Sequence, residues 1–108
     1  MGMTVDHMER ARRAWPYLAK RALKNLPPYT YKEVCAEIAV HWRAARYFLG
    51  VIQRYCRANG LPPLQFLAVN AASRLPGRGC VGSPRTDAAQ QEALRTIYAY
   101  RWPAEAPF

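Results

Sequence analysis

The chain has 108 residues and a formal net charge of +9, because 16 Lys and Arg outnumber 7 Asp and Glu. Hydrophobic residues make up 51% and charged residues 21%, a globular balance that excludes an intrinsically disordered class. No apolar run approaches the roughly 20 residues that span a bilayer, so we expect no membrane-spanning segment. The length predicts a single domain over residues 1–108.

Three cysteines lie far apart, at Cys35, Cys56 and Cys80, and no Cys-x-x-Cys pair occurs. This pattern predicts neither a disulfide framework nor a zinc site. The N-terminal run MGMTVDHMERARR contains no apolar segment of the kind that a secretory signal needs. We therefore expect a cytoplasmic protein without metal or cofactor, associated with the nucleoid if it binds DNA.

Residues 6–25 are predicted to form an N-terminal helix. Asp6 and Glu9 have the spacing of a capping box at its start. Pro16 interrupts the apolar pattern, so we expect a kink or two short helices. The outward side carries cations, which fit either a solvated face or additional phosphate contacts: Arg12, Arg13, Lys20, Arg21 and Lys24.

Residues 30–60 are predicted to form a helix-turn-helix. Thr30 and Glu33 form the Ser/Thr-x-x-Glu capping box of a short first helix. Residues 39–41 have the length of a tight turn, and a second helix is predicted over residues 42–59. Asn59 and Gly60 then close this helix as a left-handed cap. A short helix, a turn and a longer helix are the outline of the motif.

The later segments complete a predicted winged helix-turn-helix, mainly α with a small β element. Residues 64–69 alternate in the manner of a strand, and a glycine-rich turn with nearby arginines follows, so 64–82 is predicted as a strand and wing. A C-terminal helix is expected over 86–101. The tail, 102–108, is expected to dock its aromatic side chains on the body.

The second helix of the motif has a basic face. Its polar residues recur at spacings of three or four and include no acid: Arg43, Arg46, Tyr47, Gly50, Arg54 and Arg57. Phe48, Leu49 and Ile52 fall roughly opposite. Such a helix fits a DNA groove, where arginine pairs with guanine or neutralises phosphates. The alternative is a solvated basic face, although solvated faces usually mix both signs.

Residues 29–50, YTYKEVCAEIAVHWRAARYFLG, resemble the DNA-binding half of alkylguanine-DNA alkyltransferases and of the non-catalytic alkyltransferase-like proteins. The resemblance extends over 27–82 and implies a winged helix-turn-helix. It implies that Tyr31 lies against the target phosphate. It also implies that Arg46 is an arginine finger filling the space of a flipped base, and that Asn59 is a hinge after the helix.

The chain departs from that family where the family carries its nucleophile, in a Pro-Cys-His-Arg motif. The corresponding residues, 66–71, read FLAVNA and contain neither Cys nor His. Without a thiolate and its base, alkyl transfer has no mechanism, so we expect no enzyme activity. Residues 51–56 also lengthen the second helix beyond the family's usual form.

Other residues point to contacts rather than to catalysis. His41, in the turn, is expected to cap the helix or touch a phosphate. Trp42 is expected to pack on the first helix, to stack on a base, or to join a protein interface. The residues expected to contact DNA are Tyr31, His41, Trp42, Arg43, Arg46, Tyr47, Arg54, Arg57, Arg74 and Arg78.

The leading hypothesis is therefore a non-enzymatic protein that binds double-stranded DNA. One alternative is a protein-interaction adaptor, or an accessory or inhibitor protein of a mobile element or nuclease system. Its exposed anchors would be Trp42 and the aromatic residues Tyr98, Tyr100, Trp102 and Phe108. A further alternative is a sensor that binds alkylguanine without repairing it. No heptad pattern predicts a dimer.

Overall fold

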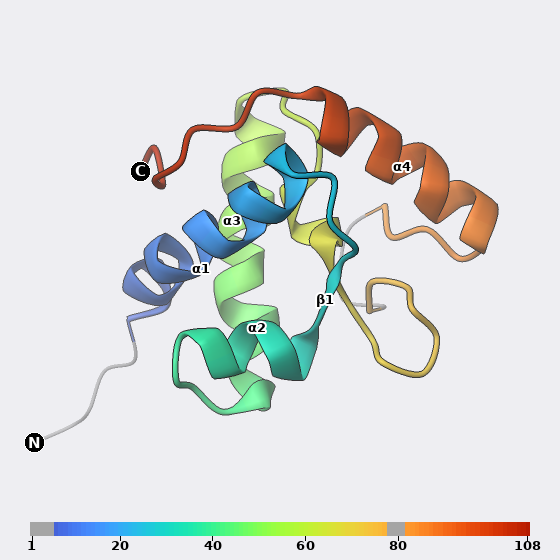
Figure 1. Cartoon of the computed structure of the whole chain (residues 1–108). Helices are drawn as coiled ribbons and strands as arrows, with labels where there is room; N and C mark the ends of the chain where they lie inside the picture. The colour runs from blue at the N-terminus through green and yellow to red at the C-terminus, as the bar shows by residue number, and fades with distance from the viewer. Residues whose placement is uncertain (1–5, 78–81) are drawn as a thin grey trace, which may run out of the picture.

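A computed structural model describes residues 6–77 and 82–108 of the chain. It is mainly helical with one small parallel sheet, which confirms the predicted mainly-α class with a small β element (Figure 1). The α-helices are α1 (His7–Leu23), α2 (Tyr31–Glu37), α3 (Ala45–Ala58) and α4 (Asp87–Ala99). The 3₁₀ helices are η1 (Trp42–Ala44) and η2 (Leu64–Leu67), and the strands are β1 (Tyr29–Thr30) and β2 (Ala68–Val69).

Helix α1 begins where the sequence predicts, with the Asp6 carboxylate accepting the Glu9 N–H at 2.9 Å. It then continues to Leu23 through the exposed Pro16, so the expectation of two short helices is wrong. Proline removes one backbone hydrogen bond. The side chains of Trp15 and Leu18, on either side of it, are fully buried, and this packing holds the helix together.

The predicted short helix, turn and longer helix form as α2, the turn 38–41, and η1 followed by α3. The capping box of α2 is confirmed, because the Glu33 carboxylate accepts the Thr30 N–H at 2.8 Å and the Thr30 hydroxyl accepts the Glu33 N–H at 3.2 Å. Ala39 takes a left-handed conformation in the turn (φ 56°). The second helix begins as a 3₁₀ turn rather than as the predicted α-helix.

The C-terminal end of α3 is closed as predicted. Gly60 adopts φ 64°, its N–H donates to the Arg57 carbonyl at 3.3 Å, and the Leu61 N–H donates to the Cys56 carbonyl at 2.8 Å. These two bonds are those of a Schellman motif, which satisfies carbonyls at the end of a helix. Because Gly60 turns the chain sharply, the residues that follow return to pack beneath α3.

The predicted strand over 64–69 is wrong for most of its length. Leu64–Leu67 form a 3₁₀ helix in which all four side chains are buried, and only Ala68–Val69 are extended. Residues on both sides of the expected strand are largely apolar. The sequence therefore lacks the regular alternation of apolar and polar residues that distinguishes a half-exposed strand from other buried structure. Strand β2 pairs in parallel with β1, with Tyr29 opposite Ala68 and Thr30 opposite Val69.

The region predicted as a wing forms no β-hairpin among the residues that the structure describes. Residues 70–75 instead form a loop that is closed by hydrogen bonds between its own residues. The Asn70 N–H donates to the Leu75 carbonyl at 2.9 Å, and the Asn70 side-chain oxygen accepts the Ala72 N–H at 2.9 Å. Arg74 lies in this loop with φ 58°. Arg78, the other predicted wing residue, lies outside the described residues.

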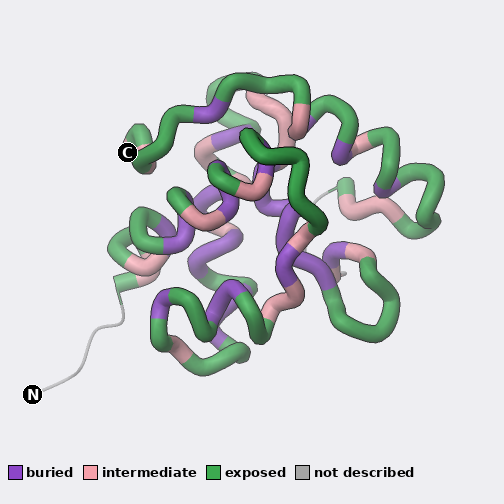
Figure 2. Tube along the Cα trace, in the orientation of Figure 1, coloured by how far each residue is buried: buried purple, intermediate pink, exposed green. Residues whose placement is uncertain are grey.

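The core lies where α1, α3 and η2 face one another, with α3 running behind α1 and α2 in Figure 1 and the buried segments gathered at the centre in Figure 2. Trp15 is its largest buried side chain, and the Trp15 indole N–H donates to the Pro103 carbonyl at 3.0 Å. The predicted docking of the tail is confirmed: Trp102 is buried, and the Phe108 ring meets that of Trp15 at 5.7 Å between centroids. Trp102 is therefore not an exposed anchor for a partner.

Helix α4 follows the prediction closely. The Thr86 hydroxyl accepts the Ala89 N–H at 3.1 Å and caps the helix, while Leu94 and Ile97 are buried against the body. None of the described helices combines the length and apolar content that crossing a membrane requires.

Candidate nucleic-acid interface

The polar face of α3 is a basic surface. Arg46, Arg54 and Arg57 are exposed, and Gly50 is half-buried among them. Residues separated by three, four or seven positions share one side of an α-helix. Arg43 joins this surface from η1, the 3₁₀ turn that precedes the helix. We refer to these four arginines as the basic face.

Among the described residues, no acidic side chain forms an ion pair with the basic face. Helix α3 contains no Asp or Glu. The two ion pairs found among the described residues lie on other helices, Glu9 with Arg13 on α1 and Glu92 with Arg95 on α4. Four like charges on one surface repel one another at low ionic strength, so an anionic partner lowers the free energy of this face.

Arg46 is folded onto its neighbour Tyr47. Its guanidinium donates to the Tyr47 hydroxyl at 3.0 Å and lies 4.8 Å from the centroid of the Tyr47 ring. Tyr47 also stacks on His7 of α1, with 4.9 Å between ring centroids and 16° between planes. The start of α1 therefore borders the basic face, which the sequence did not indicate.

His41 caps the start of η1, one of the two roles that its position predicts. Its Nδ1 accepts the Arg43 N–H at 3.1 Å, and its ring lies 5.4 Å from that of Trp42. Trp42 is 48% exposed, so about half of its surface is open to solvent. The Arg43 guanidinium lies 5.4 Å from the Trp42 ring centroid. An aromatic ring and a cation thus stand together at the N-terminal end of the basic face.

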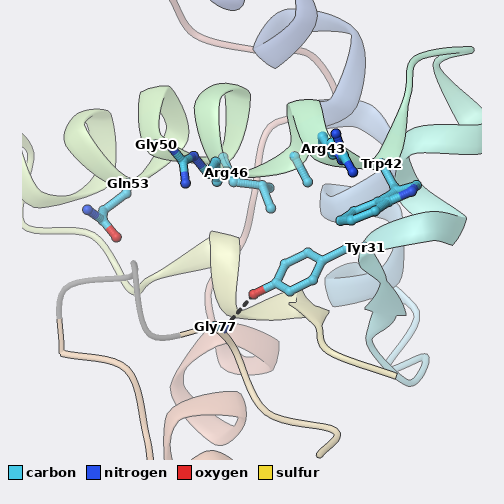
Figure 3. A pocket seen from close by; sticks show the side chains of 9 residues that line it. Tyr31, Trp42, Arg43, Arg46, Gly50, Gln53 and Gly77 are labelled. Carbon is cyan, nitrogen blue, oxygen red and sulfur yellow. Dashed lines mark hydrogen bonds between the residues drawn. The ribbon is translucent and has the colours of Figure 1, made fainter. Parts of the chain in front are cut away.

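A pocket of about 300 Å³ opens beside this end of the basic face (Figure 3). Three elements and one later turn supply its lining: α2, η1, α3 and the turn at Gly77. In Figure 3 the Tyr31 ring lies across the pocket from α3, and Trp42 closes one end. The lining residues are Tyr31, Trp42, Arg43, Ala45, Arg46, Leu49, Gly50, Gln53 and Gly77.

Tyr31 joins two distant parts of the chain at the pocket. Its hydroxyl accepts the Gly77 N–H at 2.5 Å. A β-carbon added to Gly77 would stand 3.2 Å from that hydroxyl, which is tighter than ordinary contact. At Gly50, on the facing wall, an added β-carbon would meet only the Arg54 guanidinium, at 3.6 Å. The two glycines keep side chains out of the pocket.

The structure brings together six of the predicted DNA-contact residues and leaves others apart. Tyr31, Trp42, Arg43 and Arg46 line the pocket. Tyr47 contacts Arg46, and His41 contacts Arg43 and Trp42. Arg54 and Arg57 lie on the same helix but do not line it. Their contact with DNA stays a prediction, as does that of Arg74.

Three arginines of α1 donate hydrogen bonds to main-chain carbonyls of other segments. Arg12 donates to the Phe108 carbonyl at 3.0 Å, and Arg13 donates to the Ile38 carbonyl at 2.7 Å. Arg21 donates to the Pro27 carbonyl at 2.9 Å and lies 3.8 Å from the Tyr29 ring centroid. These arginines connect the tail, the turn of the motif and the segment around β1 to α1.

The two described cysteines are placed as core residues. Cys35 and Cys56 are buried, and burial raises the pKa of both thiols. A thiol needs the thiolate form to act as a nucleophile, and a raised pKa disfavours it. Neither cysteine lines the pocket. In the part of the chain that the structure describes, no group of three His, Cys, Asp or Glu is placed to hold a metal ion.

Sequence reasoning missed three contributors to this site. Gln53 lines the pocket, and its spacing of seven from Arg46 could have placed it there. Gly77 was assigned only a turn, and its approach to Tyr31 depends on the parallel pairing of β1 with β2. His7 reaches Tyr47 only because α1 packs on α3.

Comparisons of the chain with protein-family models, with curated proteins and with solved structures find no match.

Proposed function

We propose that this chain is a non-enzymatic protein that binds double-stranded DNA through a helix-turn-helix, with α3 as its recognition helix. The observation that supports this most directly is the basic face, on which Arg43, Arg46, Arg54 and Arg57 have no acidic partner among the described residues. A helix fits the major groove of B-DNA, and arginine there reads guanine or neutralises phosphate.

The position of each arginine along α3 determines which part of the DNA it would contact. Arg43 and Arg46, near the N-terminal end of α3, would reach base edges, as the first residues of a recognition helix do. Arg54 and Arg57 would hold phosphates further along the groove. The loop of residues 70–75 would take the place of a wing, with Arg74 against the neighbouring backbone. Arg46 would exchange its bond to Tyr47 for a bond to DNA.

The test is a titration of labelled duplex DNA at several salt concentrations. Each phosphate contact contributes about 0.9 to the slope of log affinity against log salt, so the wild-type protein should show a steep negative slope. Arg46→Ala and Arg54→Ala should each weaken binding, by about tenfold if the lost contact is worth about 1.4 kcal/mol. The slope should become shallower by about one for a phosphate contact.

Arg95→Ala is the matched control, because Arg95 is an exposed arginine on α4 paired with Glu92 at 3.2 Å. It removes the same charge from a different surface and should leave binding nearly unchanged. Binding that is indifferent to salt, or equally weakened by all three substitutions, contradicts a specific role for the basic face.

The pocket beside Arg46 favours a second candidate, a sensor of alkylated guanine without repair activity. It is lined by Tyr31 and Arg46, which the family resemblance assigns to the target phosphate and to the space of the flipped base. The predicted result is tighter binding to duplex containing one alkylguanine than to the same duplex unmodified. Equal affinities would reject this candidate and leave plain duplex binding standing.

A further inference from the structure

The pocket combines surfaces of two chemical kinds. Its inner wall on α3 is apolar, formed by Ala45, Leu49 and the backbone of Gly50. Arg43 and Arg46 also line the pocket, and they bring two cationic side chains to its rim. Its lining, as far as the chain is described, contains no carboxylate. An occupant that suits both parts has a flat apolar body and an anionic group attached to it.

Two aromatic rings enclose this space from different elements. Tyr31 stands on α2 and Trp42 on η1, and the rings border the pocket together in Figure 3. Trp42 leaves nearly half of its surface exposed, at 48%, although tryptophan is one of the largest apolar side chains. Flat π systems such as nucleobases stack on aromatic side chains of this kind.

The size of the pocket limits the occupant. About 300 Å³ is at the lower end of the volumes that small-molecule sites have, which suits one ring system with a short substituent rather than a dinucleotide. Gln53 lines the pocket as well. Its carboxamide carries both a donor and an acceptor, the combination that the edge of a base requires.

We propose that this pocket binds a free purine nucleoside monophosphate. The base lies against the Trp42 and Tyr31 rings, and the phosphate pairs with Arg43 and Arg46. Arginine suits that role because its planar fork matches the oxygens of a phosphate. Gly50 and Gly77 admit the ligand because neither wall carries a side chain at those points.

A consequence concerns the DNA-binding function and rests on it. Arg43 and Arg46 belong both to the pocket rim and to the basic face, so one guanidinium cannot serve a nucleotide and a DNA strand together. The nucleotide therefore competes with DNA, and the amount of DNA bound falls as the nucleotide concentration rises.

The direct test is a calorimetric titration of the whole chain with guanosine monophosphate in the absence of DNA. Guanosine and inorganic phosphate are titrated separately. The monophosphate should bind about tenfold or more tightly than either part alone, because stacking and phosphate pairing both contribute. No binding of the monophosphate at millimolar concentration overturns the proposal, and so does equal binding of inorganic phosphate, since that shows attraction to charge alone.

Gly50→Leu locates the site. It fills the pocket without removing a charge, and α3 can accept it because an added β-carbon meets only the flexible Arg54 side chain, at an ordinary contact distance of 3.6 Å. Ala58→Leu is the control, because it adds a leucine at an exposed position of α3 away from the pocket. Affinity for the monophosphate should fall by about tenfold or more in the first variant and stay unchanged in the second. Equal binding by both variants overturns the proposed location.

Trp42→Ala provides an independent check in case Gly50→Leu does not fold. The side chain is half exposed, so its removal leaves the core intact. Loss of stacking should weaken monophosphate binding by about tenfold, while the weaker affinity for inorganic phosphate is unaffected. Unchanged monophosphate binding by a folded Trp42→Ala protein overturns the assignment of the base to Trp42.

A competition assay separates this inference from the DNA-binding proposal. Labelled duplex bound to the protein is titrated with guanosine monophosphate, with guanosine as the control at equal ionic strength. Displacement by the nucleotide alone supports competition. Binding of both ligands without displacement overturns it. If the nucleotide binds in calorimetry and duplex DNA does not bind at all, the result supports nucleotide binding in the pocket and rejects the DNA-binding proposal.

Discussion

The hydroxyl of Tyr31 accepts a hydrogen bond from the main-chain N–H of Gly77, which lies 46 residues further along the chain, at 2.5 Å. Tyr31 is the first residue of α2, and Gly77 follows the loop after β2. Together with the pairing of β1 and β2, this bond fixes the first helix of the motif to the later segment. It also joins Tyr31 and Gly77 on the side of the pocket that lies across from α3 (Figure 3).

Tyr31→Phe should lower the free energy of unfolding by about 1 kcal/mol, because the half-buried Gly77 N–H loses its acceptor while the ring remains. Urea unfolding of the two proteins measures the difference. Tyr100→Phe is the control, since the Tyr100 hydroxyl makes no hydrogen bond to the described residues and its ring is exposed. A midpoint that moves equally in both variants contradicts the role of the bond.

Arg13→Ala should loosen the turn between α2 and α3. Arg13 bridges the Glu9 carboxylate at 2.6 Å and the Ile38 carbonyl at 2.7 Å, so its loss leaves that carbonyl without the guanidinium. We expect a loss of about 1–2 kcal/mol in stability and faster hydrogen exchange at the Ala39 and Val40 amides. Lys20→Ala, at an exposed position of the same helix, should change neither quantity. Unaltered hydrogen exchange in Arg13→Ala would show that the turn is stable without the Arg13 side chain.

The Glu33 carboxylate should contribute to stability at neutral pH and not in strong acid. Its hydrogen bond to the Thr30 N–H lowers the pKa of Glu33 in the folded protein below its ordinary value. A lowered folded-state pKa favours folding above the unfolded pKa, and the contribution is lost as the pH falls through the folded pKa.

Comparison of the wild-type protein with Glu33→Gln tests this. The difference in unfolding free energy should be present at pH 7 and should be lost as the pH falls through the lowered folded-state pKa of Glu33. Because Glu33 is exposed, the difference should be small. A difference that persists unchanged into acid would assign the effect to the shape of the side chain rather than to its charge.

Cys35 and Cys56 should react slowly with an alkylating reagent in the native protein. Both thiols are buried and have a raised pKa, so the reactive thiolate is scarce and inaccessible. In denaturant both should be labelled rapidly. Peptide mass spectrometry after timed treatment gives the rate at each residue. Native labelling as fast as denatured labelling would contradict the buried positions.

Local signals in the sequence predicted the helices well. The Thr30 and Glu33 capping box, the Asp6 cap and the Gly60 termination all form, because each depends on residues only a few positions apart. The basic face was predictable for the same reason, since helical spacing alone brings Arg46 and Arg57 to one side.

Errors arose where packing overrode a local pattern. Pro16 did not end α1, because Trp15 and Leu18 are held in the core on either side of it. Leu64–Leu67 did not form a strand, because the core accepts both apolar faces of the segment and a 3₁₀ turn buries them together.

The sequence by itself determined the helical class, the helix ends and the one-signed charge of α3, which are consequences of local backbone preference and residue spacing. Only the tertiary structure decided that Tyr31, Trp42 and Gly77 meet around one pocket, and that Arg12, Arg13 and Arg21 bond within the protein. The physical reason is that such contacts join residues far apart in the chain. Their positions follow from how α1, α3 and the β1–β2 pair pack, and no local pattern records that packing.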